Sequence, residues 1–165
     1  MEKIVKGLLY DWKATRQRTL DWIDSLPLEQ LNQRLPRPGL NSFTKHIYEM
    51  GEAQKVYTSA LKGVEPDLTR IIHLTFDSSQ VVAKTKEELI NFLNDCDREF
   101  YGAIDEIYDW WEEVYIFGEN RPKYSVIELM IRHEILHHGQ FIAFGYMLGI
   151  SFPKSWIDAW ALPVK

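Results

Sequence analysis

The sequence has little cysteine, no long apolar run and no surplus of positive charge, and each shortage excludes a class of protein. The single cysteine, Cys96, excludes an internal disulfide framework and a zinc site built on several thiolates. No uninterrupted apolar stretch approaches the roughly 20 residues that a membrane span needs. Lys and Arg number 19 against 24 Asp and Glu, a net charge of −5. This balance gives no electrostatic basis for binding nucleic acid.

The first residues give no sign of export. The apolar run in MEKIVKGLLYDW is interrupted by Lys6 and Asp11 and is too short for a signal peptide. We therefore expect a cytoplasmic protein. An apolar fraction of 45% with 26% charged residues is typical of a folded globular protein and not of a disordered chain. The length of 165 residues favours a single domain over residues 1–165, large enough for a real core.

Apolar residues recur at three- and four-residue steps in four long segments, the pattern of amphipathic helices. Thr85 with Glu88 and Ser125 with Glu128 have the spacing of capping boxes, which open helices. The expected helices are, in chain order, one ending near Ser25 before Pro27, one from Asn41 or Ser42 to about Lys62, one from Thr85 through Val114, and one from Ser125 to Gly149.

The segments between these helices read as connections. Residues 26–40 contain three prolines and a glycine and leave room for one short turn. Residues 63–84 form a long connection, in which residues 71–76 are a short β-like run without a partner strand. Residues 117–124 are expected to be a loop, and an aromatic tail follows Pro153. The fold class is therefore all-α, a four-helix bundle whose long links do not force simple up-down-up-down wiring.

Histidines interrupt the apolar stripes of two helices. On the fourth helix, core-facing positions hold His133, His137 and Gln140, and the two imidazoles lie roughly 6 Å apart on one face. His46 interrupts the second helix in the same way. Three neutral imidazoles on inward faces would hold a divalent ion and leave one position open for water or substrate. For His46 alone, a hydrogen-bonded core residue is the simpler explanation, whereas a pair at this spacing is harder to explain without a ligand.

Other polar residues near these stripes have less specific explanations. We expect His138 on the flank of the fourth helix and His73 partly exposed in the long connection. Gln140 either orients a ligand or bonds a neighbouring helix. Glu49 could also orient a ligand, although a solvated helix face explains it equally well. Cys96 lies on the third stripe and is expected to be a small core residue.

The segment HEILH (133–137) also matches the zinc-protease pattern HExxH, in which Glu134 would be the general base. The match is short. A metzincin would continue with Gly and His where this chain has Gln140 and Ala143, and no glutamate follows Glu134. A zinc metalloprotease is therefore a less favoured alternative.

His46 on the second helix, followed by HEILHHGQ on the fourth, resembles the DinB/YfiT-like superfamily over almost the whole chain. The resemblance implies a metal triad of His46, His133 and His137 that binds one divalent ion, zinc or nickel. It also implies up-down-down-up wiring and a homodimer. One position departs from the family, since the residue after the last ligand is often arginine and is His138 here.

The resemblance also suggests an activity. Some members transfer a low-molecular-weight thiol, such as bacillithiol, mycothiol or glutathione, onto an electrophile. A metal ion held by imidazoles can keep a thiol in its nucleophilic thiolate form. The leading hypothesis is a metal-dependent thiol transferase whose partners are a small thiol and an electrophile. A non-catalytic metal-binding or stress-response bundle, and a metal-free bundle whose histidines bond to each other and to water, remain the alternatives.

Overall fold

The computed structural model describes residues 2–163 and shows the expected bundle of long helices. No helix in this described range is both long and apolar enough to cross a membrane. The long helices are α1 (Lys3–Ser25), α3 (Phe43–Leu61), α5 (Lys86–Asp105) and α6 (Lys123–Met147). The short elements are α2 (Leu28–Asn32), α4 (Thr69–Phe76), β1 (Glu113–Ile116), β2 (Glu119–Pro122) and α7 (Lys154–Trp160).

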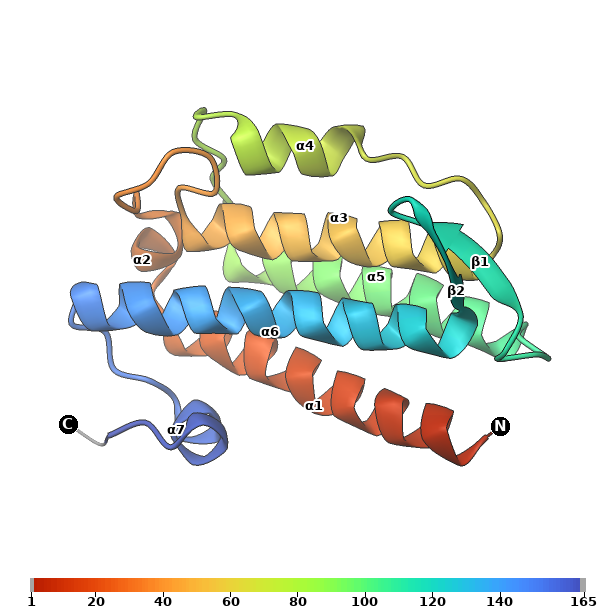
Figure 1. The fold of residues 1–165 in the computed structure, drawn as a ribbon. Coiled ribbons are helices and arrows are strands. Elements are labelled where there is room, and N and C mark those ends of the chain that lie inside the picture. The colour runs from red at the N-terminus through yellow and green to blue at the C-terminus, as the bar shows by residue number, and fades with distance from the viewer. Residues whose placement is uncertain (1, 164–165) are drawn as a thin grey trace.

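The helices are wired up-down-down-up, as the family resemblance implied. In Figure 1, α1 and α6 run in one direction and α3 and α5 in the other. The link from α3 to α5 returns along the outside of α3 and carries α4 (Figure 1). This return lets two consecutive long helices run parallel. Helices α3 and α6 pack against each other, and the candidate site lies along this contact, which we call the α3–α6 seam.

Two helix starts follow the capping chemistry in the sequence. The Ser42 hydroxyl accepts a hydrogen bond from the Lys45 N–H at 3.1 Å, so α3 begins at Phe43. The Thr85 hydroxyl accepts from the Glu88 N–H, also at 3.1 Å, and opens α5. Each cap satisfies a backbone donor that the first helical turn leaves free. The predicted starts of these two helices are therefore confirmed.

The expectation of a β-like run at residues 71–76 is wrong, because these residues form most of α4. Leu74 is fully buried, and Ile71 packs against the apolar cluster at the hairpin end of the bundle. Residues three apart share a helix face, whereas in a strand they would point to opposite sides. Packing against α3 therefore overrides the strand preference of the β-branched residues.

The third of the four predicted helices, α5, is shorter than predicted. It ends at Asp105. Of the stripe that seemed to continue, Ile107 and Trp110 lie in the connection that follows, and Val114 belongs to a hairpin in which β1 pairs with β2 in antiparallel fashion. Val114 and Ile116 are buried while their neighbours are exposed, the alternation of a strand. Phe117 and Gly118 make the turn with positive φ angles of 51° and 88°. Residues 117–124 are thus a turn, a strand and the start of α6, not a loop.

The predicted capping box at Ser125 is also wrong. α6 begins two residues earlier, at Lys123, because β2 leads directly into it. The Ser125 hydroxyl donates to the Pro122 carbonyl at 2.9 Å, and Glu128 pairs with Arg132. Helix α6 reaches Met147, close to the predicted end, and Gly149 follows with a φ of 68°.

The bundle core is divided along its length. One apolar cluster lies towards the hairpin and contains Trp12 and Phe100, and the other lies towards α2 and α7 and contains Trp22 and Phe141. Between them, the inward faces of α1, α3 and α6 carry buried polar side chains: Arg16, Thr19, His46, Glu49, Gln54, Glu134, His137 and His138. This polar layer is where the candidate site lies.

Candidate metal centre

The segment HEILHH divides its polar side chains between two seams of the bundle. His133 and His137, four residues apart, face α3, where Glu49 and His46 meet them. Glu134 and His138 follow by one residue, a rotation of about 100°, and face α1, where Thr19 contacts both. One helix therefore supplies two different buried polar groups.

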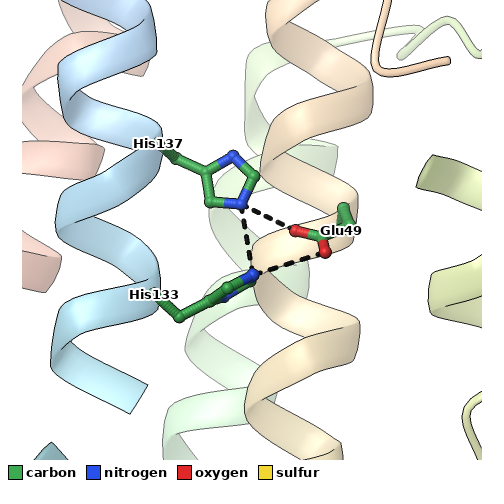
Figure 2. A group of neighbouring side chains, drawn as sticks. All are labelled: Glu49, His133 and His137. Atoms are coloured by element: carbon green, nitrogen blue, oxygen red, sulfur yellow. Dashed lines mark hydrogen bonds and ion pairs between the residues drawn. The ribbon is translucent and has the colours of Figure 1, made fainter. Parts of the chain in front are cut away.

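The group on the α3 side joins Glu49, His133 and His137 (Figure 2). The Nε2 atom of His137 lies 2.8 Å from Oε2 of Glu49, and Nε2 of His133 lies 3.4 Å from Oε1. The two Nε2 atoms are 3.4 Å apart, and the ligand atoms of all three residues lie within 4.8 Å of one another. Glu49 and His137 are buried, whereas 23% of the His133 side chain is exposed. Solvent therefore reaches this group beside His133.

These residues fit a divalent cation. Although Oε2 of Glu49 is 2.8 Å from a ring nitrogen, it accepts no well-aligned hydrogen bond from any described residue. A buried carboxylate oxygen in this situation is costly unless a cation meets it. Two imidazoles and one carboxylate are also a common donor set for catalytic zinc, with one position open.

The charge states of Glu49 and His137 also favour binding of a divalent cation. Burial opposes the charged form of Glu49, but its interactions with His133 and His137 outweigh burial and lower the pKa of the carboxyl to about 2. Burial lowers the pKa of His137, against the opposing effect of Glu49. The group therefore offers a carboxylate and a neutral imidazole at neutral pH, the forms that bind a metal.

His46 lies behind His137. Its Nδ1 is 2.8 Å from Nδ1 of His137, on the side of that ring away from Glu49. One of the two Nδ1 atoms must donate to the other, so this contact couples the tautomers of both rings. When His137 donates, its Nε2 carries a lone pair aimed at the group. The structure thus brings all three predicted ligands together, but it places Glu49, not His46, at the converging atoms.

Two further residues border the seam. Gln140, three residues after His137, accepts a hydrogen bond from Nη1 of Arg37 at 3.1 Å and so bonds a loop, not the helix that the sequence suggested. Burial lowers the pKa of His46 well below its usual value, and the charges of His137 and Arg37 lower it further. Arg37 therefore lies within electrostatic reach of the candidate centre.

The group on the α1 side pairs its opposite charges within the chain. Glu134 is paired with Arg16 at 2.9 Å and accepts the hydroxyl hydrogen of Thr19. The Thr19 oxygen in turn lies 2.8 Å from Nε2 of His138, which is fully buried and packs against the tilted ring of Trp156. The expectation that His138 lies on the flank is wrong, because α1 and α7 cover that face. Since Glu134 is engaged by α1, it does not take the position that a metalloprotease base requires.

The sequence suggested Glu49 only as an orienting or solvated residue. A solvated helix face is wrong, because Glu49 is 4% exposed. The signal was its spacing: Glu49 is three residues after His46 and therefore shares its helix face. His73 and Cys96 are as expected, the first half exposed beside Asp77 and the second buried, where burial raises the pKa of the thiol to about 12.

The sequence as a whole is similar to one known family. The model of the DinB superfamily matches residues 11–141. Among solved structures, the chain is similar to a DinB-like protein from Bacillus cereus ATCC 10987, with a TM-score of 0.69 and 19% identity. That match covers 90% of this chain and 95% of the other, and it concerns the fold alone. No curated protein matches the sequence. Since the family model covers most of the polar layer and of the bundle, the chain belongs to the DinB superfamily.

Proposed function

We propose that the protein binds one divalent metal ion on the α3–α6 seam and uses it to transfer a low-molecular-weight thiol onto an electrophile. The observation that carries the metal site is the convergence of Glu49, His133 and His137, in which a buried carboxylate oxygen lacks a well-aligned donor from the described chain. Membership of the DinB superfamily supports an associated metal. Zinc and nickel both suit a site rich in imidazole.

Two ligand sets share His133 and His137. Glu49 completes the set that the present arrangement supports, and His46 completes the triad expected from the sequence. The two sets predict different roles for His46. With Glu49 as ligand, His46 holds the proton of His137 at Nδ1 and leaves Nε2 free; with His46 as ligand, Glu49 is the supporting residue.

The ion would supply a positive charge that stabilises a thiolate over a thiol. The chain's own residues hold that charge and shape access to it. Glu49 and His137 are buried and fixed by α3 and α6, whereas His133 lies at the exposed side, where a thiol can approach. Cys96 is buried, and its raised pKa makes it a poor nucleophile, so the reacting thiol comes from outside the chain.

The reaction can be followed with monochlorobimane. The thiol loses its proton to solvent, its sulfur forms a bond to carbon, the carbon–chlorine bond breaks, and chloride leaves with the bonding electrons. We expect fluorescence to increase with bacillithiol or glutathione in the presence of metal-loaded protein. His133→Ala should abolish the catalysed rate, because it removes the exposed ligand. His73→Ala, which changes a half-exposed histidine of α4, is the matched control.

A metal-loaded protein that gives no rate above the uncatalysed reaction with several thiols would contradict the transferase. The same metal content without turnover would favour the non-catalytic metal-binding bundle. We also keep the homodimer as a proposal from the family resemblance, which light scattering of the purified protein tests.

A further inference from the structure

The connection between α2 and α3 places an arginine beside the candidate metal centre. Nη1 of Arg37 donates to Oε1 of Gln140 at 3.1 Å, and Nε donates to the Pro38 carbonyl at 3.3 Å. Gln140 is three residues after His137, roughly 4.5 Å along the axis of α6. The guanidinium of Arg37 is therefore held beside the turn of α6 that follows His137, where its charge also acts on His46.

The charge of Arg37 is not neutralised by the chain. Both of its acceptors are neutral, and within residues 2–163 no carboxylate pairs with it. Among the described residues, Arg16, Arg98, Arg121 and Arg132 have carboxylate partners, whereas Arg18, Arg34 and Arg70, like Arg37, have none; of these four, Arg37 is the one bonded to Gln140 beside the candidate centre. Nη2 of Arg37 also makes no hydrogen bond to the described residues. A half-buried arginine that keeps free donors next to a metal group is suited to an anionic ligand.

The loop that carries Arg37 is held in place. The Leu35 N–H donates to the Asn41 carbonyl at 2.8 Å and closes the loop. Gly39 has a φ of 71°, and a Cβ there would come within 2.0 Å of the Thr75 carbonyl of α4. Pro36 and Pro38 flank the arginine and restrict the backbone further. The guanidinium is therefore positioned before any ligand arrives, which reduces the entropy lost on binding.

We propose that Arg37 recognises a carboxylate on the ligand that binds at the metal centre. A guanidinium donates charge-assisted hydrogen bonds to a carboxylate, and the N–H groups of Nη2 and the second N–H of Nη1 remain available for this contact. The ligand carries its carboxylate several bonds from the atom that meets the metal, because Arg37 lies at the turn of α6 that follows His137 and not at the converging ligand atoms. This inference rests on the proposed metal site and adds the substrate class: small anionic thiols rather than neutral ones.

Binding to cobalt(II)-loaded protein tests this without turnover, because ligands on the ion change its visible spectrum. We would titrate two matched pairs, 3-mercaptopropionate against 2-mercaptoethanol, and the hydroxamate of succinic acid against acetohydroxamate. We expect the wild-type protein to bind the carboxylate member of each pair about tenfold tighter. Arg37→Gln should remove this preference and leave the affinity for the neutral ligands unchanged.

Two further variants make the result specific. Arg34→Gln changes an exposed arginine of the same loop and should keep the preference. Gln140→Glu places a carboxylate beside Arg37 and should weaken the preference while retaining the arginine. A preference that survives in Arg37→Gln, or that is absent from both pairs in the wild type, overturns the inference. Selectivity among hydroxamates with no binding of either thiol overturns the proposed transferase and upholds the role of Arg37. Failure of all four ligands to bind overturns both.

Discussion

The two faces of α6 carry largely buried polar groups whose charges are balanced in different ways. On the α1 side, Glu134 has a cation, Arg16, and a hydroxyl donor, Thr19. On the α3 side, Glu49 meets only the two ring nitrogens of His133 and His137, and one of its oxygens lacks an aligned donor among the described residues. The first group balances its charge within the chain. In the function we propose, the second is balanced by a metal ion from outside the chain.

We take this difference in charge balance, rather than burial, as what distinguishes a structural cluster from a proposed binding site. Arg16 also donates to Gln54 and lies over the ring of Trp12, so it connects α1 with α3 as well as α6. Removing a member of such a network leaves a buried charge without a partner. Removing a member of the α3-side group should instead cost the protein its metal and little of its intrinsic stability.

The largest expected effect is on metal affinity. His137→Ala should weaken binding of zinc or nickel by roughly a thousandfold, because one of three protein ligands is lost. The metal-loaded wild type should contain about one ion per chain. Elemental analysis and competition with a chelator measure both quantities, and His73→Ala is the control. Unchanged metal content in His137→Ala would show that the α3-side group does not bind the metal, and the proposed difference between the two faces of α6 would be wrong.

The next largest effect should be on the stability of the α1 side. Glu134→Gln removes the charge that pairs with buried Arg16, and we expect a loss of about 3 kcal/mol in the free energy of unfolding. Metal affinity should change little, because Glu134 faces α1. Urea denaturation of the metal-free protein measures the loss. Glu128→Gln, in the exposed pair with Arg132, is the matched control and should cost less than about 1 kcal/mol.

Much of the fold could be predicted because long helices leave a repeated signal. Helix ends were predictable because neighbouring residues determine them, as at the caps Ser42 and Thr85 and at the end of α1 after Ser25. The hairpin was missed because the helical stripe and the strand alternation coincide at Val114 over a short window. Helix α4 was missed because its burial depends on α3, which local propensity does not report.

The site was predictable to the extent that one helix carries it. His133 and His137 follow from their spacing on a core-facing stripe. The sequence could not predict whether His46 or Glu49 would converge with His133 and His137. Both residues lie on one face of α3, and their distances from the two histidines depend on the axial offset between α3 and α6. The partner of Gln140 comes from a loop, and no periodic pattern places a loop side chain.

A smaller change in metal affinity distinguishes the two possible roles of His46, as a ligand or as a residue that supports His137. If His46 only supports His137, His46→Ala should weaken metal binding by roughly 10- to 100-fold, and Glu49→Gln should weaken it more. His46→Asn can keep a polar atom near Nδ1 of His137 and should recover part of the affinity. The same chelator competition measures all three variants. A larger loss in His46→Ala than in Glu49→Gln would favour the triad of His46, His133 and His137.

The smallest expected effect concerns protons on the α1 side. Since the Thr19 hydroxyl hydrogen goes to Glu134, Thr19 accepts from Nε2 of His138, and Nδ1 of His138 is left buried without a partner in the described chain. Burial, with a smaller contribution from His137, lowers the pKa of His138 to about 3. Between this value and the ordinary one of 6.5, the unfolded chain binds the proton and the folded chain does not. Stability of the metal-free protein should therefore fall as the pH falls below about 6.5, by at most about 1.4 kcal/mol per pH unit from this residue. His138→Gln can keep a donor towards Thr19 and does not titrate, so its unfolding free energy should depend less steeply on pH. Equal slopes for the two proteins would mean that the α1-side network accommodates a charged histidine, and the contrast between the two faces of α6 would then rest on Glu49 and Glu134 alone.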